Sequence, residues 1–127
     1  MTVRELVGKL AEHGGGAAFE KAFSADALRA AGIDMDAQRL SRLDAAVMLH
    51  KYLLEVAGIP DLEDISAAAV LKDLYDCRKC VNHIAQVYLR GIMKPVSLKL
   101  PGGNSILLFD SGSEDVGSIL LPAWTNP

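Results

Sequence analysis

The sequence predicts a mainly α-helical fold, a small bundle of four to five helices with a C-terminal β-hairpin. Up to about residue 93, apolar residues recur at spacings of three and four between glycine-rich or proline-containing breaks, which indicates amphipathic helices. Aromatic residues make up only 6% of the chain while alanine and leucine are plentiful, a balance that suits close helix packing. Beyond that point the apolar residues alternate around a turn, as they do in a hairpin.

The chain is long enough for one domain with its own core. Its 127 residues are half apolar and 23% charged, which is an ordinary globular composition and not a disordered one. We therefore predict a single domain over residues 1–127, with a helical part at about 1–93 and the hairpin and an apolar tail at about 94–127.

Capping signals mark the first helices. Thr2 is placed to cap a helix that runs to about Glu12 and stops at three consecutive glycines. A second helical stretch covers residues 17–31, with a break near Ser24 and a stop at Gly32.

A third helix is predicted from Ser41, its N-cap, to about Ala57, with Gly58 as its stop. Asp44 adds a negative charge at the positive end of the helix dipole. The apolar face consists of Leu43, Val47, His50, Leu54 and Ala57. A face this broad places the helix at the centre of the bundle, with His50 as a packed or partly exposed side chain.

The longest helix is predicted to start after Asp64 or Ser66 and to end near Gly91. One side of it is an apolar seam of Val70, Leu74, Cys77, Val81, Ile84 and Tyr88. The opposite side is a polar stripe of Lys72, Asp76, Lys79, His83, Gln86 and Arg90. This division is typical of an amphipathic helix with one buried face.

The residue pattern of the C-terminal third predicts two strands and a surface that contacts another copy of the chain. Residues 96–100 and 105–109 flank a turn, and residues 119–124 are more apolar than a free tail usually is. One small bundle can hardly cover both faces and both edges of two strands, so we expect the hairpin and tail to pair with another copy of the chain. A symmetric dimer is the expected homo-oligomer.

Cys77 and Cys80 form a CxxC pair that is followed by His83. On the predicted long helix the pair lies mid-helix, where the dipole gives a redox thiol no help, and Cys77 falls in the apolar seam. We therefore expect two core thiols and no bound metal. A zinc site made of Cys77, Cys80 and His83, and a redox pair, remain the alternatives.

The sequence carries no arrangement typical of an enzyme. It contains no GxSxG motif and no Cys–His pair with an orienting group, and its paired carboxylates lie in linkers without an apolar pocket. We expect a protein that is not an enzyme, with no catalytic residues and no cofactor.

The net charge of −3 argues against general binding of nucleic acid, yet the charges are unevenly distributed. Between Cys77 and Phe109 there are five basic residues and no acidic one: Arg78, Lys79, Arg90, Lys94 and Lys99. They form either a solvated surface or a contact surface for an anionic polymer or an acidic protein. No apolar run is long enough to span a bilayer and no signal peptide is recognisable, so we expect a cytoplasmic chain unless an export signal was removed.

The segment Leu40-Ser41-Arg42-Leu43-Asp44 resembles the ITRAE-containing helix start of S-layer homology modules, with Arg42 matching the motif arginine. Gly32-Ile33 lies just upstream, as the Gly-Ile helix end does in those modules. A second partial copy follows: Asp61 to Asp64 resembles the Phe-x-Asp opening of a module, and the predicted long helix ends in Gly91-Ile92-Met93. The resemblance covers about residues 19–93, at most one and a half modules.

Members of that family attach bacterial surface proteins to anionic secondary cell-wall polymers. The resemblance therefore implies a non-catalytic binding or interaction domain for an anionic glycan or an acidic protein surface. Arg42 is the ligand contact that the motif implies, and Lys79, His83 and Arg90 are further candidates from the polar stripe. The alternative function is that of a cytosolic homo-oligomeric assembly module.

Overall fold

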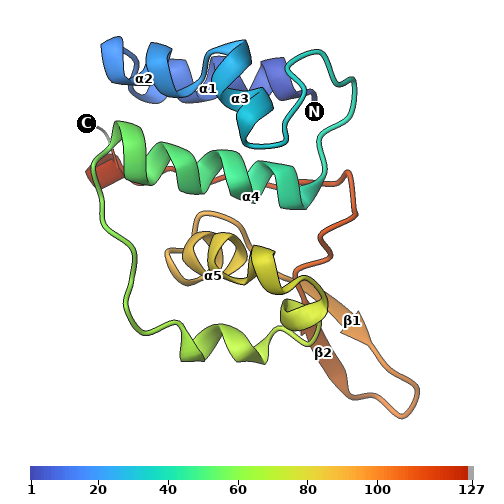
Figure 1. Ribbon diagram of the computed structural model, residues 1–127. Helices are drawn as coiled ribbons and strands as arrows, with labels where there is room; N and C mark the ends of the chain where they lie inside the picture. Colours follow the sequence, from blue (N-terminus) through green and yellow to red (C-terminus); the bar gives the residue numbers. More distant parts are fainter. Residues whose placement is uncertain (126–127) are drawn as a thin grey trace.

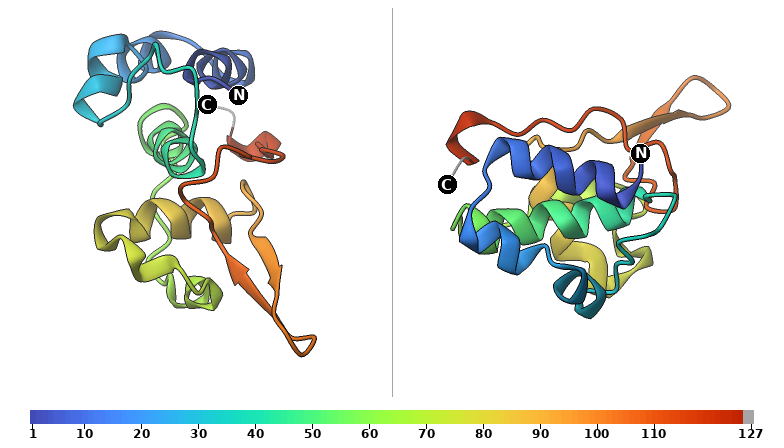
Figure 2. Two further views of the ribbon diagram at one scale, coloured as in Figure 1. Left: turned by 90° about the vertical axis from the view of Figure 1, so that its right-hand side faces the viewer. Right: turned by 90° about the horizontal axis from the view of Figure 1, so that it is seen from above.

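The computed structural model describes residues 1–125 and confirms a mainly α-helical fold with one hairpin. The chain is arranged in layers around α4 (Arg42–Lys51), as Figure 1 shows. On one side of α4 lie α1 (Val3–His13), α2 (Ala17–Ala22) and α3 (Ala25–Ala30), and on the other lies α5 (Val81–Leu89). The C-terminal segment runs back beside α1 and α4, whereas the hairpin projects from the layers (Figure 2).

Short helical turns and two strands complete the chain. α4 continues into a π-helical turn, η1 (Tyr52–Val56). The 3-10 turns are η2 (Ser66–Val70), η3 (Leu74–Asp76), η4 (Arg78–Cys80) and η5 (Ala123–Thr125). The predicted hairpin is confirmed, since β1 (Val96–Lys99) and β2 (Ser105–Leu108) pair antiparallel with Leu98 opposite Ile106. Within residues 1–125, no helix has the length and apolar character needed to cross a membrane.

Side-chain caps fix where several helices begin. The hydroxyl oxygens of Thr2, Ser24 and Ser41 accept hydrogen bonds from backbone N–H groups three residues later, at 3.1, 3.1 and 3.0 Å. The predicted caps at Thr2 and Ser41 and the predicted break near Ser24 are therefore confirmed. Each cap contributes about 1 kcal/mol, because it satisfies an amide that has no partner inside its helix.

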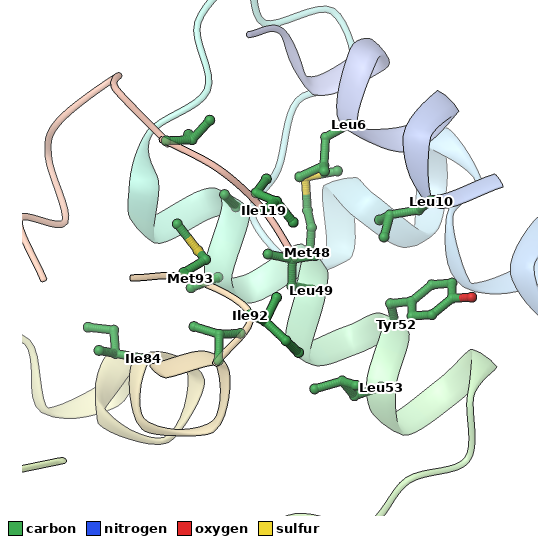
Figure 3. Close-up of a cluster of buried hydrophobic side chains, with 14 of the residues drawn as sticks. Leu6, Leu10, Met48, Leu49, Tyr52, Leu53, Ile84, Ile92, Met93 and Ile119 are labelled. Atoms are coloured by element: carbon green, nitrogen blue, oxygen red, sulfur yellow. The ribbon is translucent and has the colours of Figure 1, made fainter. Parts of the chain in front are cut away.

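α4 is the centre of the core because it is covered from two sides. Met48, Leu49 and Tyr52 have no exposed surface. Figure 3 shows them among Leu6, Leu10, Ile84, Ile92, Met93 and Ile119, which come from other segments of the chain. Full burial of one such large apolar side chain contributes about 1.5 to 3 kcal/mol, so this cluster is the main source of stability.

The buried face of α4 and η1 differs from the predicted one. Leu54, which the prediction placed in that face, is 42% exposed, whereas Leu53 and Val56 are buried. A π-helical turn holds more residues than an α-helical turn, so the side chains beyond Lys51 are rotated away from the α-helical spacing. The prediction had assumed an unbroken α-helix to Ala57.

The predicted long helix ending near Gly91 is wrong. Of that stretch Val81–Leu89 is α-helical, and short 3-10 turns precede it. Leu71 leaves the helical conformation and forms a bridge with Leu107 of β2, and the Lys72 N–H donates to the Leu107 carbonyl at 2.8 Å. The chain here is therefore shaped by its contact with the hairpin and not by its own helical pattern.

A carboxylate secures the same junction. The two oxygens of Asp73 accept hydrogen bonds from the backbone N–H groups of Phe109 and Asp110, both at 2.7 Å. Bonds of this kind, with an ionised acceptor, are stronger than bonds between neutral groups. They replace the local helical bonds and tie the segment before α5 to the end of β2.

The C-terminal tail packs on its own chain. Ile119 is 6% exposed and forms an antiparallel bridge with Met93. The buried Thr125 hydroxyl lies 2.7 Å from Nε2 of His13 in α1. The apolar surface that was expected to pair with another copy is therefore covered in part by the chain itself. Residues 126 and 127 of the predicted tail lie outside the described residues.

The buried guanidinium of Arg42 joins the start of α4 to the chain beyond α5. Its Nε donates to the Phe109 carbonyl and its Nη2 to the Lys94 carbonyl, each at 2.6 Å. Its Nη1 donates to the carbonyls of Asp115 and Val116 at 3.2 and 3.3 Å. Arg42 is 3% exposed, so its predicted role as a ligand contact is corrected: the protein itself occupies its donors.

We expect Arg42→Lys to lower the free energy of unfolding by about 2 to 4 kcal/mol, because an ammonium group cannot reach carbonyls spread around a planar guanidinium. Arg39→Lys is the matched control, since Arg39 forms an exposed ion pair with Glu114. This substitution should lower the free energy of unfolding by less than about 1 kcal/mol. Urea unfolding of both variants measures the difference. We call the hydrogen bonds of Arg42 to these four carbonyls the Arg42 clamp. Equal stability of the two variants would show that the clamp does not stabilise the fold.

Candidate functional site

Two histidines and an aspartate join α4, α5 and the linker between them. Nε2 of His50 lies 2.6 Å from Oδ1 of Asp61, and Nδ1 of His50 lies 2.8 Å from Nδ1 of His83. His50 is 4% exposed, while Asp61 and His83 are half-buried. The two imidazole rings meet edge to face, with centroids 4.9 Å apart. We call these three residues the His–Asp cluster.

The contacts of the His–Asp cluster limit where its protons can lie. A carboxylate accepts, so Nε2–H of His50 donates to Asp61. Between the two Nδ1 atoms one ring donates and the other accepts, and which ring donates depends on which nitrogens carry the protons. Nε2 of His83 forms no hydrogen bond with the rest of residues 1–125.

Amide side chains extend the network along α5. Nδ2 of Asn82 donates to the second oxygen of Asp61 at 2.8 Å, and Nε2 of Gln86 donates to the Asn82 side-chain oxygen at 3.1 Å. Gln86 also bonds both backbone groups of Leu62, at 3.0 and 3.1 Å. Gln86 has no exposed surface, so its predicted place in an exposed polar stripe is wrong. Its amide instead satisfies the buried backbone of the linker.

The surroundings lower the pKa of both half-buried members of the cluster. Burial alone would raise the pKa of Asp61, but hydrogen bonds from His50 and Asn82, with the positive charge of Arg90, bring it below its usual value. Burial, reinforced by His50, lowers the pKa of His83, and attraction to Asp61 offsets this only in part. An ionised Asp61 and a neutral His83 are therefore the favoured forms at neutral pH.

The His–Asp cluster is not seen to contact a nucleophilic side chain in residues 1–125. Among residues 1–125, His83 hydrogen-bonds to no hydroxyl or thiol that it could activate as a nucleophile. The hollow lined by Arg4, Arg29 and Asp36 lies against α1 and α3 and includes none of the three residues. The hydrogen bonds of the cluster hold the linker that carries Asp61 against α4 and α5.

Cys77 and Cys80 are joined by a disulfide bond that closes over the two residues between them. The prediction of two free core thiols is therefore wrong. Cys80 is the N-cap residue of α5, so the pair lies at the start of a helix and not in the middle of one. In this state the sulfurs cannot serve as thiolate ligands in the alternative zinc set with His83. Within the described part of the chain, no group of three or more histidine, cysteine or acidic side chains is arranged to hold a metal ion.

The structure does not bring the predicted ligand contacts together. Arg42 is buried in its clamp, and His83 belongs to the His–Asp cluster. Lys79 is exposed on η4. Arg90 donates to the Pro60 carbonyl at 2.7 Å and stacks over the Trp124 ring, 5.6 Å from its centroid. Of the four, Lys79 keeps its whole charge free for a ligand.

Comparison with known protein families, with characterised proteins and with solved structures found no match. Function must therefore be argued from the arrangement of the side chains. Sequence reasoning had placed His50 on the apolar face of its helix, but it missed the pairing with Asp61. A histidine on an apolar face with an aspartate in the following linker is the signal that could have found it.

We expect acid to destabilise the protein as the pH falls below about 6.5, the ordinary pKa of histidine. Because folding lowers the pKa of His83, the unfolded chain binds more protons in this range, so stability falls as pH falls. Asp61 adds a further loss only below about pH 4. Melting temperatures between pH 7.5 and 5 should fall less steeply for His83→Gln than for the unaltered protein. An identical slope in both proteins would refute the assignment.

Proposed function

We propose that the chain is a non-catalytic binding module that engages an anionic partner through the basic residues between Cys77 and Phe109. The observation that carries the proposal is that these cations lack carboxylate partners in residues 1–125. The basic residues are Arg78, Lys79, Arg90, Lys94 and Lys99. Within residues 1–125 none of them forms an ion pair, whereas the ion pairs present use arginines, a lysine and a histidine from residues 4–51.

Exposure supports the same proposal. Arg78, Lys79, Lys94 and Lys99 are exposed, and Arg90 is half-buried. The segment before η3 is tied to β2 through Leu71, so η4 and the hairpin belong to one part of the molecule. Exposed cations without carboxylate partners keep their full electrostatic attraction for an anionic polymer.

The resemblance to S-layer homology modules supports an anionic glycan as the ligand class. The helix start that carries the resemblance is capped by Ser41, as its sequence predicts. Arg42, the residue that matches the motif, is taken up by its clamp to four backbone carbonyls. In our proposal the contact to the glycan therefore passes to the exposed cations, with Arg78 and Lys79 first among them.

Binding to purified cell-wall fragments that carry anionic polymers tests the proposal. Arg78→Glu/Lys79→Glu should weaken binding by about tenfold or more, because it removes two attractive charges and adds two repulsive ones. Lys9→Glu/Lys21→Glu makes the same change in net charge at exposed lysines of α1 and α2, and should bind nearly as well as the unaltered protein. Equal losses in both variants, or no binding by the unaltered protein, would refute the proposal.

The hairpin favours a second function, assembly with another copy of the chain. β1 pairs with no strand other than β2 in the described residues, so its outer edge is open. Leu98 of β1, opposite Ile106 of β2, is 46% exposed. An open edge with an apolar side chain is suited to strand pairing between molecules.

We expect light scattering to give a mass that rises with concentration, and Leu98→Lys to keep the protein monomeric, because a charge on the edge strand opposes pairing. Leu120→Lys is the control, since Leu120 is 49% exposed on the tail, away from the hairpin. Its mass should follow that of the unaltered protein. A monomer at high micromolar concentration would exclude this second function.

A further inference from the structure

We propose that the Cys77–Cys80 disulfide is a thiol–disulfide exchange site that takes a cysteine-containing polypeptide segment as its substrate. The inference does not depend on the binding function above, because it rests on the disulfide, its exposure and the surface beside it.

The disulfide holds together residues that are already neighbours in the chain. It closes a loop with a sequence separation of three, between η3 and α5. A cross-link restricts the unfolded chain less when the loop that it closes is shorter, so this bond adds little to stability compared with one that joins distant elements. Most of the hydrophobic core is formed by side chains from other segments, with Cys80 as one member and Cys77 packed against it. We therefore expect the fold to persist when the bond opens.

The two sulfurs differ in their surroundings. Cys77 is half-buried, whereas Cys80 is 8% exposed and packs with the hydrophobic core. Cys77 is therefore the more exposed of the two cysteines, and the one that a thiolate from another molecule reaches more readily. A directed exchange reaction requires such a difference, since attack must fall on one sulfur and leave the other as the leaving group.

The position of Cys80 favours its departure as a thiolate. It is the N-cap residue of α5, a helix of nine residues, so the positive end of the helix dipole favours a negative charge there, while the burial of Cys80 opposes that charge. Arg78 and Lys79 follow Cys77 and are exposed, with Asp76 as the acidic neighbour on the other side. A leaving thiol of lower pKa departs faster.

A surface depression beside the disulfide offers a place for the substrate. Its volume is about 500 Å³, and Tyr75, Arg78 and Val81 line it. These residues stand in the sequence immediately around the two cysteines, and the Tyr75 side chain is 64% exposed. An exposed aromatic ring, an apolar side chain and a guanidinium suit an extended peptide better than a small thiol. The substrate is therefore a cysteine-bearing segment of a protein with two thiols.

The exchange balances without any further reactant. A substrate thiolate attacks Sγ of Cys77, the Cys77–Cys80 bond breaks, and its electron pair leaves on Sγ of Cys80, which takes up a proton. The second substrate thiolate then attacks the substrate sulfur of the mixed disulfide and displaces Cys77, which also takes up a proton. The substrate dithiol is oxidised to a disulfide, and Cys77 and Cys80 are reduced by two electrons and two protons.

The full-length protein with a reduced dithiol peptide tests the proposal. Mass spectrometry should show peptide disulfide and reduced protein appearing in equal amounts, with the circular dichroism spectrum of the protein unchanged. Tyr75→Ala should slow the reaction with the peptide by about threefold or more and leave that with dithiothreitol unchanged, because the smaller thiol does not need the depression. Trp124→Ala removes another exposed aromatic ring, on η5, and should change neither rate.

Single-cysteine variants identify the sulfur that is attacked. Cys80→Ser should form a mixed disulfide with an activated peptide disulfide about ten times faster than Cys77→Ser, because the remaining sulfur is the accessible one. A disulfide that resists the dithiol peptide in the folded protein would overturn the proposal. So would faster labelling of Cys80 than of Cys77. If either variant fails to fold, the comparison of peptide with dithiothreitol on the unaltered protein decides the matter.

Discussion

One buried cation holds the two halves of this protein together. The guanidinium of Arg42 stands at the start of the central helix, and its acceptors are backbone carbonyls from the chain beyond α5. Burial lowers the pKa of Arg42, while Asp110, Asp115 and Asp73 oppose this shift by attraction, so the charge is retained. Irregular backbone in the core would otherwise leave those carbonyls without partners, at a cost of about 1 to 3 kcal/mol each. The tail can lie over α4 as an extended segment because an arginine satisfies its polar groups.

The sequence predicted correctly those features that depend on residues close together in the chain. The caps at Thr2 and Ser41 depend on a side chain and an amide three residues apart, and both were predictable. The hairpin followed from alternation on either side of a Pro-Gly-Gly-Asn turn. The mainly α-helical class followed from the spacing of apolar residues in the first two thirds of the chain. All of these signals act over a few residues, which is the range that a single sequence reports well.

The failures have a common cause, because each depends on a distant partner. The pattern around Leu71 is helical, yet Leu107 draws its backbone into a bridge. Gln86 looks like a surface residue until the linker at Leu62 lies against it. The placement of the cysteines followed from the helix error: a mid-helix CxxC became one at a helix start. The candidate site was the least predictable part. The sequence identified Arg42 as a notable cation but did not show that backbone carbonyls surround it. It also did not show that Asp61 pairs with His50.

The clamp also bears on the order in which this protein can fold as it is synthesised. The acceptors of Arg42 follow it by 52 to 74 residues, and the Thr125 partner of His13 follows by 112. The first four helices leave the ribosome with a buried cation that has no acceptors and with one side of α4 uncovered. Their final packing must wait until the segment from Lys94 to Thr125, which covers them, has been synthesised.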